Sequence, residues 1–337
     1  MSDHLRLLLI SLAVAGCAMD GEPELDTDSV ESASTVTQWK ARGWVPNQKS
    51  EYQVGLAYFN GRLQMVHNGH SDPHELWWTS FDGNSWTANV KLPHRATGGP
   101  ALQVRNGRLD MVYRDASQNR LLIASYDGFT FGAPRAAGSP LDGQVLKSEP
   151  ATGLTSFGKH LLVAYCTNTS VRIDRYDGTR WALAHSIPAP DYSTCEHVEL
   201  AGVIGGGEMN LYYATENEMI SWRDYPIYEV NGDGFSWGTP RALPNKKTKQ
   251  PISIVTCRGK THMTHGGLTD ASEVWWSERV RNPNGSYDWG PDERVPNQHS
   301  WGGAAVGCMG GIEDPQRTFM IHNNTDGRLY QLEFFGS

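Results

Sequence analysis

The sequence predicts an all-β protein, a six-bladed β-propeller made of four-stranded antiparallel blades. The first observation is a motif that occurs six times, an aromatic residue followed seven residues later by Pro or Gly. Successive motifs lie roughly 45 to 55 residues apart, a period typical of propeller blades. The second observation is the same order of turns in each interval. The third is that the last repeat lacks the strand that the first motif supplies. The motifs are Trp39/Pro46, Trp86/Pro93, Phe131/Gly138, Trp181/Pro188, Trp237/Pro244 and Trp289/Pro296.

Each repeat predicts four strands in a fixed order. An apolar first strand leads to a Gly turn such as Asn60-Gly61, and a second strand ends in an aromatic residue or His. A third strand, such as Leu76–Phe81, ends in an Asp-Gly or Asn-Gly turn, and the fourth strand carries the motif. These dipeptides favour tight hairpins because they accept positive φ. Each repeat is therefore expected to be an antiparallel meander. The second strands end at His67, Tyr113, Tyr165, Tyr213, His265 and His322.

The propeller is expected to span residues 38–337 and to close through its N-terminal strand. Residues 329–336 match residues 76–83, and the sequence ends there, before a fourth strand. Trp39–Pro46 has the sequence of a fourth strand but follows no first three strands of its own. Pairing these two segments would complete the sixth blade and leave the ring without an exposed strand edge.

The N-terminal segment predicts export. Residues 1–16 include the apolar run Leu7–Ala15, which has the length of a signal peptide and is too short to span a bilayer. Val14-Ala15-Gly16-Cys17 resembles the lipobox of bacterial lipoproteins, which implies cleavage before Cys17 and lipidation of that residue. Residues 17–37 are acidic and polar, a composition typical of a flexible tether. We expect a protein of the bacterial cell envelope, anchored by lipid at the outer membrane or the cell surface.

Charge and cysteine content exclude several classes of partner. Residues 1–37 carry seven acidic residues and one basic residue, so −2 of the net charge of −8 remains for residues 38–337. A domain with so little charge lacks the basic surface of nucleic-acid-binding proteins, and we expect no nucleic-acid partner. Four cysteines follow Cys17, and their even number in an exported protein favours disulfides. Of the three possible pairings the sequence favours Cys166–Cys195 with Cys257–Cys308. No CxxC spacing occurs, and no cofactor or metal is expected.

Two repeats resemble those of bacterial β-propeller lectins. The segment Gly107–Arg114 followed by Tyr126-Asp127-Gly128, and the segment Asn60–His67 followed by Leu76-Trp77-Trp78, have the pattern of the fucose-binding propeller lectins of Photorhabdus type. The resemblance extends over about 300 residues as a repeat pattern. It implies a non-catalytic carbohydrate-binding protein whose partner is a glycan or polysaccharide.

The candidate binding face is the one that carries the loops between second and third strands, where polar residues and His are frequent. We expect pockets between blades in which aromatic rings contact sugars and polar groups bind their hydroxyls. The first such pocket would place His67 and Trp78 opposite Tyr113 and Arg114. His67 and Tyr113 could instead only pack the rim of their blades, and Arg114 could instead form a salt bridge to Asp72 or Asp115. The candidate ligand-binding residues are His67, Trp78, Tyr113, Arg114, Tyr165, Tyr213, His265, Trp276 and His322.

Two other functions fit the same fold. A glycoside hydrolase or polysaccharide lyase is the first, and a protein-binding scaffold is the second. Glycoside hydrolysis requires two carboxyl groups about 5–9.5 Å apart. Five carboxyl residues could supply such a pair, but their sequence positions identify no catalytic pair, so the sequence favours a non-catalytic protein. These residues are Glu196, Glu199, Glu216, Asp270 and Glu273.

Overall fold

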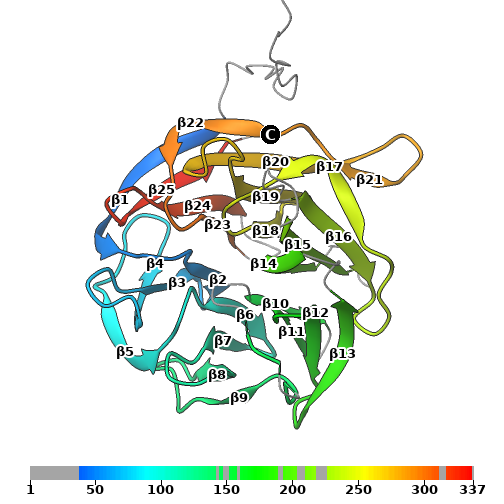
Figure 1. Cartoon of the computed structure of the whole chain (residues 1–337). Coiled ribbons are helices and arrows are strands. Elements are labelled where there is room, and N and C mark those ends of the chain that lie inside the picture. The colour runs from blue at the N-terminus through cyan, green and yellow to red at the C-terminus, as the bar shows by residue number, and fades with distance from the viewer. Residues whose placement is uncertain are drawn as a thin grey trace, which may run out of the picture. The chain divides into compact units, whose positions relative to one another are not determined.

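A computed structural model describes residues 38–141, 144–146, 152–157, 160–188, 193–202, 209–217, 226–310 and 316–335. Over these ranges the chain forms strands, turns and loops, arranged as six antiparallel sheets (Figure 1). No helix able to cross a membrane occurs in this part of the chain. The structure confirms the six-bladed β-propeller. The predicted signal peptide and tether, residues 1–37, lie outside the described residues.

Blades 1 to 3 follow one another along the chain, with the first strand innermost. Blade 1 contains β2 (Gly55–Phe59), β3 (Arg62–Asn68), β4 (Glu75–Phe81) and β5 (Val90–Arg95). Blade 2 contains β6 (Ala101–Arg105), β7 (Arg108–Arg114), β8 (Leu121–Tyr126) and β9 (Arg135–Ala137). Blade 3 contains β10 (Thr152–Phe157), β11 (His160–Cys166), β12 (Ser170–Tyr176) and β13 (Trp181–Pro188).

Blades 4 to 6 repeat this order with two variations. Blade 4 contains β14 (Ser193–Gly202), β15 (Met209–Asn217), β16 (Pro226–Gly232) and β17 (Arg241–Lys247). Blade 5 contains β18 (Ser253–Cys257), β19 (Lys260–Gly266), β20 (Glu273–Arg281), β21 (Tyr287–Trp289) and β22 (Glu293–His299). Its outer strand is divided, since β21 and β22 pair with opposite ends of β20. Blade 6 contains β23 (Ala304–Met309), β24 (Arg317–Asn323), β25 (Arg328–Phe334) and β1 (Trp39–Lys49).

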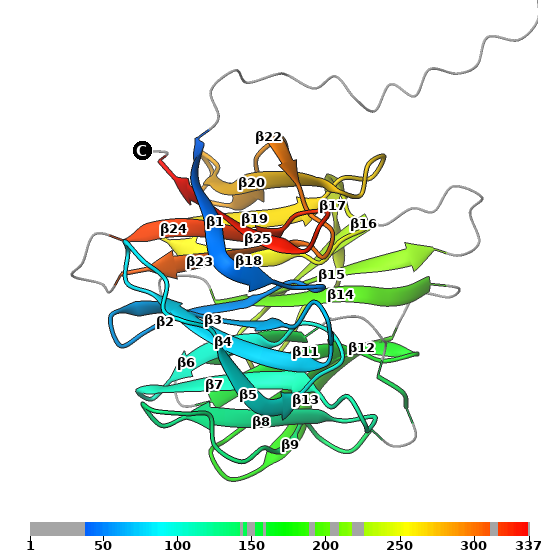
Figure 2. The same cartoon turned by 90° about the vertical axis from the view of Figure 1, so that its left-hand side faces the viewer.

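The ring closes through the N-terminal strand, as the sequence predicted. β1 is antiparallel to β25, with Trp39 opposite Phe334 and Trp44 opposite Tyr330. Figure 2 shows these two strands side by side although they come from opposite ends of the chain. The innermost strands β2, β6, β10, β14, β18 and β23 each contact the innermost strands of both neighbouring blades. No blade of the ring is therefore left without a neighbour.

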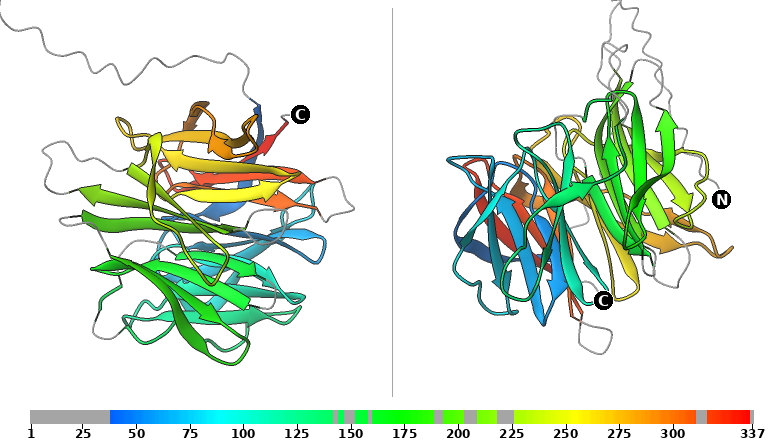
Figure 3. Two further views of the ribbon diagram at one scale, coloured as in Figure 1. Left: turned by 90° about the vertical axis from the view of Figure 1, so that its right-hand side faces the viewer. Right: turned by 90° about the horizontal axis from the view of Figure 1, so that it is seen from below.

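The hydrophobic core lies between blades, because successive residues of a strand point to opposite faces of its sheet. Val66 belongs to the apolar cluster that blade 1 shares with blade 2, whereas Met65 belongs to the cluster shared with blade 6. Figure 3 shows the sheets facing one another around the ring. Each strand residue near the middle of a blade therefore faces one of the two neighbouring blades. Side chains can meet across an interface only if both of them face it.

Two disulfides connect neighbouring blades. Cys166 bonds to Cys195, from blade 3 to blade 4, and Cys257 bonds to Cys308, from blade 5 to blade 6. The Cα atoms are 5.5 Å apart in both pairs, within the usual range for a disulfide. The structure confirms the pairing that the sequence favoured.

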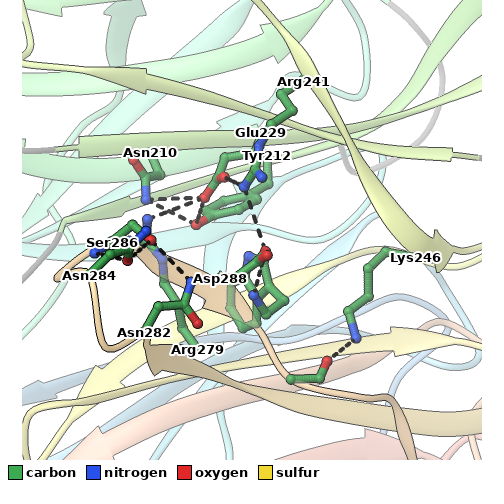
Figure 4. A network of polar contacts seen from close by, with 12 residues as sticks. Asn210, Tyr212, Glu229, Arg241, Lys246, Arg279, Asn282, Asn284, Ser286 and Asp288 are labelled. Atoms are coloured by element: carbon green, nitrogen blue, oxygen red, sulfur yellow. Dashed lines mark hydrogen bonds and ion pairs between the residues drawn. The ribbon is translucent and has the colours of Figure 1, made fainter.

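A buried ionic network joins blades 4 and 5 (Figure 4). Glu229 accepts hydrogen bonds from the Tyr212 hydroxyl and from Arg241, both at 2.8 Å, and forms an ion pair with Arg279 of blade 5 at 3.5 Å. Asp288, also of blade 5, lies 3.8 Å from Arg241. Two guanidinium groups thus compensate a carboxylate that would otherwise be costly to bury. Tyr212 is fully buried, so the network stabilises the contact between the blades.

Candidate functional site

The second-strand histidines are buried between blades. His67 is 1% exposed, and its Nε2 lies 2.6 Å from Oε1 of Gln48, which belongs to β1 of blade 6. Its Nδ1 lies 2.7 Å from the carbonyl oxygen of Asn68. Burial lowers the pKa of His67 below its ordinary value, because desolvation disfavours the charged ring. His67 is therefore a polar contact between two blades.

Of the two other second-strand histidines, His322 makes an equivalent contact and His265 contacts a carboxylate of its own blade. Nε2 of His322 lies 2.9 Å from Oε1 of Gln298, an outer-strand residue of blade 5. Burial lowers the pKa of His322 to about 4. His265 forms a 3.2 Å contact with Asp292, which also pairs with Lys246 of blade 4.

A repeated backbone turn supplies the partners of His67 and His322, and in blade 4 it supplies Lys246, which pairs with the Asp292 partner of His265. In three blades a Pro-Asn pair has its Asn at positive φ, and the next residue is Gln48, Lys246 or Gln298. The Asn residues are Asn47 (φ 57°), Asn245 (φ 57°) and Asn297 (φ 58°). Asn tolerates this left-handed conformation better than most residues. The turn brings the next side chain into the interface with the following blade.

The second-strand tyrosines also lie in interfaces. Tyr113 packs edge-on against His94 of blade 1, with ring centroids 5.7 Å apart. The Tyr165 hydroxyl donates to Oδ2 of Asp174 at 2.6 Å. Tyr213 stacks on Tyr228, with centroids 5.1 Å apart. Burial raises the pKa of all three phenols, since desolvation disfavours the phenolate.

The predicted pocket between blades 1 and 2 is brought together only in part. His67 is opposite Trp77 in the strand ladder and Val66 is opposite Trp78, so His67 and Trp78 point to opposite faces of blade 1. Trp78 and Tyr113 share the interface between blades 1 and 2.

Arg114 follows Tyr113 in β7 and therefore points to the other face of blade 2. Trp78 is half-buried, and its Nε1 donates to Gln64 at 3.0 Å. Trp276 is 4% exposed and packs against Trp39 and Phe334. Ligand binding by the nine candidate residues stays a prediction.

Three other aromatic residues lie beside the second-strand histidines in the strand ladders, and the sequence reading did not select them. Trp77, Trp275 and Tyr330 lie directly opposite His67, His265 and His322 in the ladders of blades 1, 5 and 6. All three are partly buried, as Trp78 also is. The alternation of side chains along each strand could have identified these residues from the sequence. Each of these rings must share a face with the second-strand His, whereas the following residue must point away from it.

Charged groups accompany these rings. In blade 1, Lys91 pairs with Glu75, and its ammonium lies 6.0 Å from the centre of the Trp77 ring. In blade 5, Arg294 donates to Glu273 at 2.7 Å, and the other oxygen of Glu273 accepts from Nε1 of Trp275 at 3.2 Å. The same combination of aromatic ring, carboxylate and cation therefore occurs at corresponding places in two blades.

Blade 6, which lies between them, carries a related arrangement. The Arg328 guanidinium stands 4.2 Å from the centre of the Trp44 ring, and Trp44 packs edge-on against Tyr330. Trp44 is 44% exposed, and Trp301, in the loop that leads into blade 6, is 63% exposed. Glu51 and His70 form an ion pair in the neighbouring loops of blade 1.

We call this set the aromatic face. It comprises Trp44, Glu75, Trp77, Lys91, Glu273, Trp275, Arg294, Trp301, Arg328 and Tyr330. Aromatic rings offer flat apolar surfaces, and the charged groups beside them can donate and accept hydrogen bonds. The arrangement is chemically suited to ligands that have both apolar faces and hydroxyl groups. Among the described residues, no group of three or more His, Cys, Asp or Glu could hold a metal ion.

A cavity of about 480 Å³ lies on the axis of the ring, lined by the first strands of the blades. Glu199 of β14 is the one carboxyl residue among the described lining residues. Burial raises the pKa of Glu199 well above its ordinary value. A raised pKa suits a general acid, but the glycosidase mechanism needs a second carboxyl group. The described lining does not provide it.

Comparisons with known proteins support the fold. No protein-family model matches the sequence, and no curated protein sequence matches it. Among solved structures, the chain is similar to the SapL1 lectin in complex with alpha methyl fucoside, with a TM-score of 0.54 and 16% identity over 85% of this chain and 94% of that chain. It is similar to the fucose-specific lectin from Aleuria aurantia, with a TM-score of 0.56 and 12% identity over 85% of this chain and 93% of that chain.

A protein of unknown function from Dyadobacter fermentans is also similar, with a TM-score of 0.58 and 10% identity over 89% of this chain and all of that chain. At these identities the likeness shows the propeller architecture alone. Propellers host many unrelated functions, so function must be argued from the site.

Proposed function

We propose that this protein is a non-catalytic carbohydrate-binding propeller whose sites lie on the aromatic face of blades 5, 6 and 1. The observation that carries the proposal is the repeated combination of a partly exposed ring with a carboxylate and a cation, at Trp77 and at Trp275. Stacking on a sugar ring uses the aromatic surface, and the paired charges can hydrogen-bond its hydroxyls. One similar structure is a lectin in complex with alpha methyl fucoside and another is a fucose-specific lectin, which supports a glycan as partner.

Repetition of the site on neighbouring blades should increase affinity for glycan-coated surfaces. Three neighbouring blades of one rigid ring present rings and charges on the same face. Sites of this kind bind a glycan-coated surface more tightly than a free sugar, because the second contact forms at a high effective concentration.

The proposal extends to location. We propose export and lipid anchoring through Cys17, with residues 17–37 as the tether. The described chain begins at the end of β1 where Trp39 pairs with Phe334, the end at which third strands turn back. The loops between second and third strands lie at the opposite ends of the strands. The aromatic face therefore lies at the end of the strands opposite to Trp39, where the described chain begins.

A glycan array with the full chain carrying Cys17→Ser tests the proposal, because this substitution removes the lipid attachment. Binding without release of product supports a lectin. Release of sugars that stops when one carboxyl residue is substituted would instead identify a hydrolase or lyase. Absence of both would leave a protein-binding scaffold as the function.

A further inference from the structure

The axial cavity has features of a second binding site, apart from the aromatic face. Its volume of about 480 Å³ lies in the range of small-molecule pockets. The aromatic face is formed by outer strands and loops, whereas the cavity is formed by first strands. A ligand in the cavity would therefore use different residues from a glycan on the aromatic face.

The strand register singles out Glu199. Glu199 is opposite Tyr212 in blade 4, at the level where Gly55 is opposite Val66 in blade 1. In the other blades the first strand also carries a small residue at this level. These residues are Ala101, Gly153, Ser253 and Ala305. Glu199 is therefore the one charged residue that the first strands carry at this level, and it lines the cavity.

Glu199 has no counter-ion in the described lining of the cavity. This lining contains no Lys, Arg or His, and its polar side chains are amides and hydroxyls, namely Gln53, Tyr58, Gln103, Thr155, Ser253 and Thr256. Cys308, which also lines the cavity, is held in a disulfide. Tyr212, the cross-strand partner of Glu199, donates its hydroxyl to Glu229. An isolated carboxylate is costly to bury, and Glu199 therefore holds a proton more strongly than an exposed Glu.

We propose that the axial cavity binds a small amino sugar, whose ammonium group pairs with the Glu199 carboxylate. A compact polyhydroxylated cation matches the lining in both respects. Its charge compensates the one acidic group, and its hydroxyls find amide and hydroxyl partners. A metal ion matches less well, because Ca²⁺ takes 6–8 oxygen ligands and is usually held by several carboxylates or carbonyls.

Binding is linked to the release of a proton. Below the raised pKa, Glu199 is neutral in the free protein, and pairing with an ammonium group requires the ionised form. The complex therefore loses a proton from Glu199, and affinity increases as pH rises towards the pKa of Glu199. The effect ends where the carboxyl is already ionised before the ligand arrives.

Calorimetric titration of the full chain carrying Cys17→Ser tests this proposal. The probes are glucosamine, glucose and N-acetylglucosamine, of which only glucosamine carries an ammonium group. We expect glucosamine to bind at least ten-fold more tightly than glucose, with proton release that appears as different heats in buffers of different ionisation enthalpy. Glu199→Gln should abolish the preference and the proton release. Glu293→Gln is a matched control, since Glu293 is a half-buried carboxyl residue of β22 whose pKa is also raised by burial.

The possible outcomes separate this site from the aromatic face. Trp77→Ala with Trp275→Ala should leave glucosamine binding unchanged, so failure of the surface proposal would not remove the cavity site. Equal affinity for glucosamine and glucose would overturn the inference. So would an unchanged preference in Glu199→Gln, or the absence of measurable glucosamine binding at millimolar concentrations.

Discussion

Trp39→Ala is the sharpest perturbation of ring closure. Trp39 is 3% exposed and lies with Trp276 and Phe334 in an aromatic cluster, with ring centroids 6.0 and 5.2 Å away. Truncating a buried Trp to Ala typically costs about 3–5 kcal/mol. Because β1 is the last strand of blade 6, this loss weakens the contact that joins the two ends of the chain.

Trp44→Ala is the matched control on the same strand. Trp44 is exposed, and its contacts are an edge-on pair with Tyr330 and the Arg328 guanidinium above its ring. Aromatic and cation–π pairs at exposed sites contribute about 1 kcal/mol. Both variants change the same residue type, so the difference between them measures burial in the closing strand.

Urea unfolding followed by tryptophan fluorescence and circular dichroism measures both variants. The account predicts that Trp39→Ala lowers the free energy of unfolding by about 3–5 kcal/mol and Trp44→Ala by about 1 kcal/mol. Thermal midpoints should fall in the same order. Equal free energies of unfolding for the two variants would refute the reasoning, because β1 would then not be packed as the closing strand.

Three further predictions concern stability. Removing the Cys257–Cys308 disulfide by Ser substitution at both positions should cost about 4 kcal/mol, from the chain entropy of a loop of 51 residues, and unfolding in urea measures it. Asn297→Ala should cost about 1–2 kcal/mol by thermal unfolding, because Asn297 has positive φ, whereas Asn297→Gly should be tolerated. Burial raises the pKa of Glu199, so its ionisation destabilises the fold as pH rises above the unfolded value near 4.5. The unfolding temperature of Glu199→Gln should therefore equal that of the parent below that pH and exceed it at neutral pH. A higher unfolding temperature at every pH would contradict this.

Much of the fold could be predicted from the sequence because its signals are local and repeated. The motif period determined the number of blades, and the unmatched Trp39–Pro46 segment identified the closing strand. Both disulfides followed from the position of each Cys in adjoining repeats. These inferences need only the order of strands along the chain, which a meander preserves in space.

The site was harder to predict because it depends on which face of a strand each residue occupies. The sequence reading selected Trp78 and Trp276, which face the following blade, and not Trp77 and Trp275, which share a face with the second-strand histidines. It also did not place Gln48 against His67, although the two residues are 19 positions apart, because their contact depends on how blade 6 packs against blade 1.

The position of Glu199 in the axial cavity also could not be predicted from the sequence. Only the assembled ring shows that Glu199 lines the axial cavity and that the other five first strands carry small residues at its level. Pairings between blades depend on long-range packing, which no local pattern encodes.

The most direct test of the central claim is the affinity of the best glycan from the array for Trp77→Ala and Trp275→Ala. Phe129→Ala is the matched control, because Phe129 is 89% exposed in the turn between the third and fourth strands, at the opposite face of blade 2. Loss of stacking at one site should weaken binding to a glycan-coated surface about five-fold or more, since a stacking contact contributes on the order of 1 kcal/mol and the loss of one of several sites also lowers avidity. The account predicts this loss for both Trp variants and none for Phe129→Ala. Unchanged binding by the Trp variants, with their folding intact, would contradict it.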